Sequence, residues 1–208
     1  MKKFLLIDDH VVVRSGIKVL LSEIYKPSLI DEANDGESAL AKIKETIYDL
    51  VILDVQMPDT DSFGLMEYFK ARYPSLRVLV FSMSPENIYA RRFLKAGAKG
   101  FINKNAPLDE IKKAINLVLN NKKYISEGMV EILAEANAKE TDSNLFNSLS
   151  AREFEIVSLL LNGKTISNIA STLHLAVSTI GTHKARLFKK LNVNNLLALK
   201  DLANKHNL

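Results

Sequence analysis

The sequence predicts an α/β fold in which a doubly wound, five-stranded parallel sheet is followed by a small domain of four helices. Two observations predict this architecture. Over the first 122 residues, short apolar runs alternate with amphipathic stretches, which is typical of βα units joined by right-handed crossovers. From residue 149 onwards the apolar residues follow the helical period, which indicates a separate all-α domain.

The expected strands are short runs rich in apolar residues, and helical patterns separate them. The strands are expected at Lys3–Ile7, Leu29–Glu32, Leu50–Asp54, Arg77–Ser82 and Gly100–Asn103. The helices between them are expected near Val13–Glu23, Glu37–Thr46, Ser62–Tyr73, Pro85–Ala96 and Leu108–Asn121. Four of the 5 prolines lie between these elements or at helix starts, where a missing N–H does little harm.

The second domain is expected to contain four short helices. They lie at Ala151–Leu161, Thr165–Thr172, Val177–Lys190 and Asn194–Ala203. Ser150 and Glu153 form a capping-box pattern before the first of them, and Asn162-Gly163 is typical of a helix end. We expect domains over residues 1–122 and 148–208, joined by a helical and flexible linker over 123–147 whose flexible part begins at Asn137.

Composition limits the class of protein. With 208 residues, 47% of them hydrophobic, the chain can form a sizeable core, which argues against extensive disorder. The absence of cysteine excludes disulfides and thiolate metal sites and fits a reducing compartment. The apolar run Phe4–Ile7 is too short for a signal peptide, and no run approaches the ~20 residues that span a bilayer. We expect a soluble, cytoplasmic protein without a membrane partner.

Charge is distributed unevenly along the chain. Residues 126–148 carry one basic and five acidic residues, whereas residues 149–208 carry eight basic and three acidic residues. A basic module behind an acidic connector suggests a domain that binds a polyanion such as nucleic acid. Charge alone leaves open the alternative of a solvated basic face.

Polar residues at the ends of the expected strands carry the candidate chemistry. Asp8, Asp9, Asp54, Ser82 and Lys104 close or follow apolar runs, and the carboxyl ends of parallel strands meet at one edge of a sheet. Crowded carboxylates repel each other unless a hard cation such as Mg²⁺ lies among them, and a nearby lysine would complete a pocket for a phosphoryl group. Taken singly, the aspartates could cap a helix and the lysine could be a solvated loop residue.

These residues, in their order and spacing, resemble the receiver domain of two-component response regulators. The matching positions are Asp8-Asp9, Asp54 followed by Met57-Pro58, Ser82, Phe101 and Lys104. The resemblance covers residues 1–122 and implies that Asp54 is the phosphoacceptor, with a histidine kinase as partner. It also implies that Asp8, Asp9 and the backbone carbonyl of Gln56 bind Mg²⁺, and that Lys104 pairs with Asp54 and then with the phosphate.

Ser82 and Phe101 resemble the switch pair of that family. The resemblance implies that the Ser82 hydroxyl moves to the phosphate and that the Phe101 ring turns inward, which would reshape the surface around the fourth and fifth helices. The apolar neighbours of Phe101 leave open a simpler role in the core.

Residues 149–208 resemble the LuxR/NarL-type helix-turn-helix domain. The match includes Leu149–Glu153, Gly163, Ile169-Ala170, Ser178–Ile180, Thr182-His183 and Lys189–Leu191. The resemblance implies that the helix Val177–Lys190 enters the major groove of double-stranded DNA, and its period places Ile180, Leu187 and Leu191 inward. The expected DNA contacts are Lys164, Thr179, Thr182, His183, Lys184, Arg186, Lys189 and Lys190.

Two residues depart from the family pattern. Gly181 stands where lysine is common and weakens the helix by ~1 kcal/mol relative to alanine. Ala176 stands where serine is frequent, which removes a good N-cap. The last expected helix carries four leucines beyond one narrow stripe, so it could be a dimerising helix or part of the domain core.

We therefore interpret the chain as a response regulator transcription factor of the NarL/FixJ family, active as a homodimer. On this interpretation phosphorylation of Asp54 controls DNA binding, and the chain promotes only its own phosphorylation and dephosphorylation. One rival is a phosphatase that uses Asp54 on external substrates, although Gln56 stands where such enzymes often carry a second acid. Another is an adaptor that binds only protein, which the basic tail disfavours. Control independent of phosphorylation also stays open.

Overall fold

The computed structural model describes residues 1–58, 60–130, 145–206 and 208. The chain divides into two compact units, Met1–Val130 and Glu131–Leu208. Within the described ranges, none of the helices has the length and apolar composition that crossing a membrane requires.

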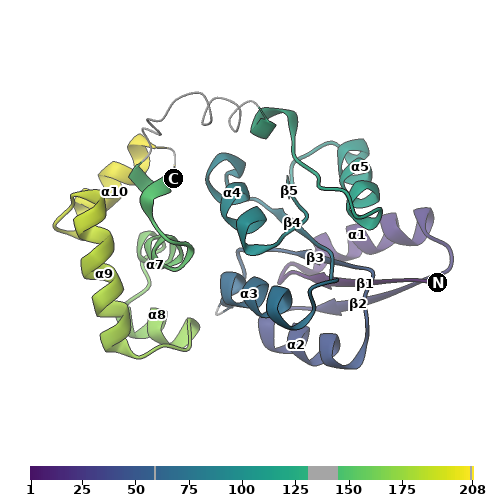
Figure 1. The fold of residues 1–208 in the computed structure, drawn as a ribbon, viewed down its shortest axis with the longest axis horizontal. Helices are drawn as coiled ribbons and strands as arrows, with labels where there is room; N and C mark the ends of the chain where they lie inside the picture. The colour runs from purple at the N-terminus through teal and green to yellow at the C-terminus, as the bar shows by residue number, and fades with distance from the viewer. Residues whose placement is uncertain (59, 131–144, 207) are drawn as a thin grey trace. The chain divides into compact units, whose positions relative to one another are not determined.

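The first unit is built on a five-stranded parallel sheet with the order β2-β1-β3-β4-β5 (Figure 1). The strands are β1 (Lys2–Ile7), β2 (Ser28–Ala33), β3 (Leu50–Leu53), β4 (Val78–Ser82) and β5 (Gly100–Asn103). Every residue of β3 and β4 is buried, as expected for strands that are covered on both faces. The five predicted strands are confirmed, and their ends differ by no more than one residue from those expected.

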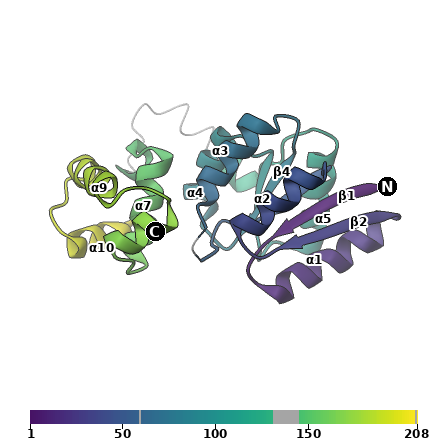
Figure 2. The same cartoon turned by 90° about the horizontal axis from the view of Figure 1, so that it is seen from below.

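Helices cover both faces of this sheet. They are α1 (Val11–Ile24), α2 (Gly36–Glu45), α3 (Ser62–Arg72), α4 (Glu86–Ala96) and α5 (Leu108–Leu119), and all five were predicted. Helices α1 and α5 lie on one face, and α2, α3 and α4 lie on the other (Figures 1 and 2). Under α1 and α5 the core joins helix residues such as Leu21 and Ile115 to strand residues such as Phe4 and Ile52. The arrangement is the doubly wound sheet that the sequence predicts.

The sheet order places the chemically important residues at one edge. Strands β1 and β3 are neighbours, so Asp8 and Asp54 follow them side by side. The ladder continues past the strand ends, because the Asp54 N–H donates to the Ile7 carbonyl at 2.8 Å. The Lys104 N–H likewise donates to the Ser82 carbonyl at 3.0 Å. The backbone that carries these side chains is therefore held by the sheet itself.

Tyr124 fastens the chain that follows α5 to the edge strand. Its backbone N–H donates to the Lys99 carbonyl at 2.9 Å, and its hydroxyl donates to Glu110 Oε1 at 2.6 Å. A Cβ at Gly100 would lie 3.0 Å from Tyr124 Cβ, so a larger residue there would require Tyr124 to shift away from the strand. Tyr124 is buried and packs with the first unit, two residues past the expected limit of 1–122.

The second unit is helical. It contains the 3₁₀ helix η1 (Leu145–Ser148) and the α-helices α7 (Ala151–Leu161), α8 (Ile166–Thr172), α9 (Val177–Leu191) and α10 (Leu196–Lys205). The predicted capping box is confirmed, because the Ser150 N–H donates to Glu153 Oε2 at 2.8 Å and the Glu153 N–H donates to Ser150 Oγ at 3.2 Å. Gly163 ends α7 with a φ of 76°, and Ala176 makes no side-chain cap at α9, as expected.

The expected flexible linker from Asn137 to Ser148 is wrong at its end. Residues 145–148 form η1, and Phe146 is fully buried with its ring 5.8 Å from the ring of His206. One large aromatic side chain buries enough apolar surface to order a short polar segment, which composition alone does not reveal. Residues 131–144, which make up most of the expected linker of 123–147, lie outside the described residues.

Candidate functional site

An ion-paired cluster forms at the carboxyl edge of the sheet. Lys104 Nζ lies 2.7 Å from Asp8 Oδ2 and 2.8 Å from Asp54 Oδ2. All three side chains are largely buried, since Asp8 is 5% and Asp54 is 2% exposed. Lys104 follows β5, two strands away from β3, so its long side chain spans the end of β4 to reach Asp54. The sequence predicted the pair with Asp54, and the structure adds Asp8 as a second partner.

Backbone donors hold the other oxygen of the Asp54 carboxylate. Asp54 Oδ1 accepts from the N–H of Val55 at 2.6 Å and from the N–H of Gln56 at 3.1 Å. Burial lowers the pKa of the Lys104 ammonium group, but its hydrogen bonds to Asp54 and Asp8 outweigh this effect, so the pKa lies above its usual value. Lys104 is therefore a permanent cation beside a fixed carboxylate.

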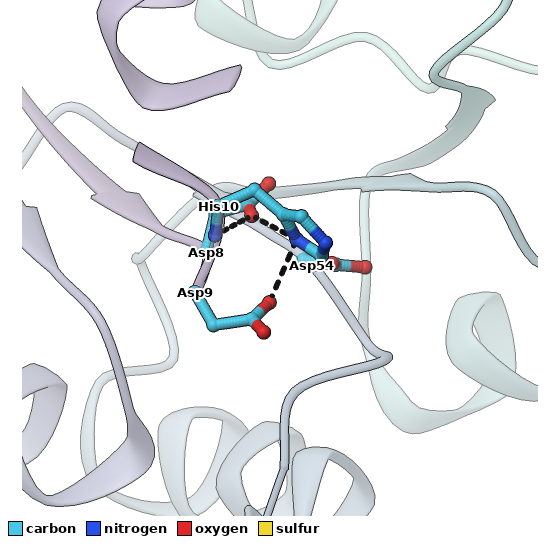
Figure 3. Close-up of side chains that lie close together, drawn as sticks. All are labelled: Asp8, Asp9, His10 and Asp54. Carbon is cyan, nitrogen blue, oxygen red and sulfur yellow. Dashed lines mark hydrogen bonds and ion pairs between the residues drawn. The ribbon is translucent and has the colours of Figure 1, made fainter. Parts of the chain in front are cut away.

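The donor atoms beside this ion pair suit a hard cation. Possible ligand atoms of Asp8, Asp9, His10 and Asp54 all lie within 4.8 Å of one another (Figure 3). Asp9 Oδ1 is buried and has no hydrogen-bond donor, although His10 Nδ1 lies 2.9 Å away without the alignment of a hydrogen bond. Carboxylate oxygens with free lone pairs are the ligands that Mg²⁺ prefers. Asp8 and Asp9 thus fit the predicted metal role.

Sequence reasoning missed His10. Its backbone N–H donates to Asp8 Oδ1 at 2.8 Å, and its ring Nδ1 lies 3.2 Å from the same oxygen. The only signal in the sequence was its place directly after two aspartates. The contacts show that His10 orients the Asp8 carboxylate from the solvent side.

The predicted switch residues Ser82 and Phe101 are engaged in other contacts in this structure. Ser82 is fully buried, and its Oγ donates to Ser84 Oγ and accepts from the Ser84 N–H, both at 3.2 Å. The ring of Phe101 is 1% exposed and belongs to the core in this structure. Gln56 is exposed and contacts Asp54 through its backbone N–H. A role of the Gln56 carbonyl in metal binding stays a prediction.

The second candidate site is the outer surface of α9. Ile180, Leu187 and Leu191 are almost completely buried, which confirms their predicted inward position. Of the expected DNA contacts, Thr182, Arg186, Lys189 and Lys190 are exposed, whereas Lys164, Thr179, His183 and Lys184 are half-buried. An amphipathic helix with a basic outer side after a short helix and a tight turn is typical of a helix-turn-helix.

Comparison with known families decides the class of protein. The model of the response regulator receiver domain matches residues 4–116, which is more than half of the chain. The model of the bacterial regulatory proteins of the luxR family matches residues 147–203. The chain belongs to the response regulators with a LuxR-type DNA-binding domain.

Relatives of this response regulator match it along its whole length. BvgA of Bordetella pertussis, whose name describes a regulator of virulence-factor transcription, is 34% identical over 99% of this chain and 98% of its own. The response regulator GacA of Pseudomonas syringae pv. syringae is 31% identical over 100% of this chain and 98% of its own. A structure of RcsB from Salmonella enterica serovar Typhimurium, bound to promoter rprA with the phosphomimetic BeF3⁻, is similar in fold. Its TM-score is 0.77, at 24% identity over 97% of both chains.

Two lysines of the response regulator that the sequence assigned to DNA are engaged within the second unit. Lys190 Nζ lies 2.6 Å from Glu153 Oε2 and donates to the Ser148 carbonyl at 3.4 Å. Lys184 Nζ lies 5.2 Å from the centre of the Phe188 ring, a cation–π distance. The Lys190 contact depends on the packing of α9 against α7, whereas Lys184 and Phe188 lie four residues apart on one side of the same helix.

Proposed function

We propose that this response regulator accepts a phosphoryl group on Asp54 from a histidine kinase, and that this event controls dimerisation and DNA binding. The observation that carries the proposal is the buried Asp54 carboxylate, which Lys104 contacts at 2.8 Å beside the Asp8 and Asp9 carboxylates. An Asp54 oxygen would attack the phosphorus atom, the bond from phosphorus to the kinase histidine would break, and an acyl phosphate would form.

The neighbouring residues supply the charge that this transfer needs. A carboxylate attacks an anionic phosphodonor poorly, so positive charge must offset the repulsion. Lys104 provides one such charge, and Mg²⁺ bound by Asp8, Asp9 and the Gln56 carbonyl would supply the rest. The backbone N–H groups of Val55 and Gln56 orient Asp54 so that its second oxygen faces Lys104.

The proposed switch begins at Ser82. Its hydroxyl must leave Ser84, which it contacts at 3.2 Å, before it can donate to a phosphoryl oxygen. Because the Phe101 ring is already buried, we infer that movement of Ser82 and the adjoining loop, and not a large swing of the ring, carries the change outward.

The second half of the proposal is transcription control in the cytoplasm, through the insertion of α9 into the major groove of double-stranded DNA. The name of BvgA supports a role in transcription. Contacts are proposed from Lys164, Thr179, Thr182, His183, Arg186 and Lys189, with smaller contributions from Lys184 and Lys190. Helix α10 leaves Leu196 38% and Leu197 69% exposed, which supports a homodimer through this helix.

We do not propose an enzyme that turns over external substrates. A phosphatase needs an acid to protonate the leaving group, and the side chain that follows Asp54 by two residues is the exposed amide of Gln56. Hydrolysis of a generic phosphate ester that depends on Asp54 would contradict this assignment.

Intact mass after incubation with acetyl phosphate and Mg²⁺ tests the phosphoacceptor. We expect one added phosphoryl group on the wild type and on Asp109→Asn, whose carboxylate is exposed on α5. Asp54→Asn should gain none. Phosphorylation of Asp54→Asn to the same extent as the wild type would contradict the proposal.

A further inference from the structure

The outermost line of α9 can be located from its buried side. Successive residues of an α-helix are rotated by about 100°, so the side opposite Ile180, Leu187 and Leu191 carries positions 178, 182, 185 and 189. All four residues there, Ser178, Thr182, Ala185 and Lys189, are exposed. If α9 lies in the major groove, this line faces the base edges most directly.

Two methyl groups occupy the middle of this line. Thr182 Oγ1 donates to the Ser178 carbonyl at 3.1 Å, so its hydroxyl is turned onto the backbone and its methyl group is left outward. Ala185, one turn further on, offers only its methyl group. Gly181 lies beside them, and apart from its chain neighbours and the backbone of α9, no atom of the described structure lies within 4 Å of the Cβ position there. The helix backbone can therefore approach a ligand closely at this point.

The long polar side chains of α9 lie to the sides of this line or at its end. Lys184 rests on the Phe188 ring and Lys190 on Glu153. Arg186 lies on the flank of the line, rotated by about 40° from Thr182 around the helix axis. Lys189 reaches the line only in the last turn. Positions 182 and 185, in the middle of the line, thus carry neither arginine nor lysine, the side chains that commonly pair with guanine in the major groove.

We propose that this response regulator recognises thymine, by contact of the Thr182 and Ala185 methyl groups with the 5-methyl groups of thymine bases. The proposal rests on the insertion of α9 into the major groove. Thymine is the only base that displays a methyl group there, and threonine methyl and alanine are suited to contact it. Arg186 and Lys189 would bind phosphates, which position the helix without selecting a sequence.

Replacement of thymine by deoxyuridine is the sharpest test, because it removes the 5-methyl group and leaves every hydrogen-bonding atom in place. The full-length chain, treated with acetyl phosphate and Mg²⁺, is used to select duplexes from a randomised library. Each thymine of the selected duplex is then replaced singly, and affinity is measured by fluorescence anisotropy. We expect about a fourfold loss at one or two positions per half-site, the effect of one buried methyl group.

Protein variants assign the effect to a residue. Thr182→Ser keeps the hydroxyl and loses the methyl group, so thymine and deoxyuridine should bind equally at the position that Thr182 reads. Thr165→Ser is the matched control, because it makes the same change at the N-cap of α8, outside the proposed DNA contacts, and the penalty should persist. Arg186→Ala should weaken binding to both duplexes alike and reduce its salt dependence.

The outcomes separate the two proposals. Equal affinity for every deoxyuridine duplex, with binding still tight and salt-dependent, would overturn thymine recognition and leave DNA binding intact. A penalty that survives Thr182→Ser and also Ala185→Gly would overturn the residue assignment. Failure to enrich any duplex would overturn both proposals, because the chain would then not bind DNA sequence-specifically.

Discussion

The Lys190 ammonium group lies 2.6 Å from Glu153 Oε2 and so joins the last turn of α9 to the capping box of α7. Glu153 is buried, and its carboxylate also accepts from the Ser150 N–H. A lysine on α9, the proposed DNA-binding helix, thus completes the N-terminus of another helix. The contact fixes α9 against the rest of the domain.

Replacement of Lys190 should mainly lower stability, whereas replacement of Lys189 should mainly weaken DNA binding. Lys190→Ala leaves the buried Glu153 carboxylate without its cation and should lower the free energy of unfolding of the second unit by about 1–2 kcal/mol. Lys189→Ala should change stability by less than about 0.5 kcal/mol, because Lys189 is exposed, but should weaken DNA binding. Urea unfolding and DNA affinity of both variants provide the measurement. A stable Lys190→Ala variant with weakened DNA binding would contradict the structural role.

The same pair predicts a pH dependence. Burial raises the pKa of the Glu153 carboxyl group, but hydrogen bonds from Lys190 and Ser150 outweigh it, so the folded pKa lies below the usual value of 4.5. Stability from this group is therefore complete above pH 4.5 and is lost as the pH falls through the folded pKa. Glu153→Gln should be less stable than the wild type at neutral pH, and this difference should shrink on acidification. A difference that is constant from about pH 7 to about pH 3 would refute this account.

Bound Mg²⁺ should partly restore the stability that is lost when Lys104 is replaced. Lys104→Gln leaves the Asp8 and Asp54 carboxylates buried without their cation, which should destabilise the first unit by about 3 kcal/mol in the absence of divalent metal. Millimolar Mg²⁺ should raise the melting temperature of this variant more than that of the wild type, because a bound cation removes the same repulsion. Lys112→Gln, at an exposed pair with Asp109, should behave as the wild type does. Equal Mg²⁺ shifts in all three proteins would contradict the coupling between Lys104 and the metal, and no shift in any of them would contradict the predicted metal site.

Tyr124→Phe tests the attachment of the chain after α5. The variant loses the 2.6 Å hydrogen bond to Glu110 and should lower the free energy of unfolding of the first unit by about 1–2 kcal/mol. Tyr25→Phe is the control, since the Tyr25 ring packs on Phe4 at 5.4 Å and its contribution is mainly apolar. Chemical denaturation of both variants gives the comparison, and equal stability would argue against a role for the Tyr124 hydroxyl.

Local patterns in the sequence were sufficient for most of the fold. The apolar runs of β3 and β4 predicted buried parallel strands, because a strand covered on both faces has no polar face to show. Ser150 and Glu153 predicted the start of α7, since a capping box joins residues three positions apart. The failure at Leu145–Ser148 has the opposite cause, because Phe146 is fully buried and its ring packs against that of His206, which lies far away in the chain.

The candidate site likewise has features that the sequence predicted and features that only the structure revealed. The sequence by itself determined that Asp8, Asp54 and Lys104 would meet, because parallel strands place their carboxyl ends at one edge of the sheet. Only the tertiary structure decided which side chains are free to act. Lys190 pairs with a residue 37 positions earlier, and Lys104 reaches Asp8 as well as Asp54. Contacts between distant residues depend on side-chain packing in three dimensions, which no local period or spacing encodes.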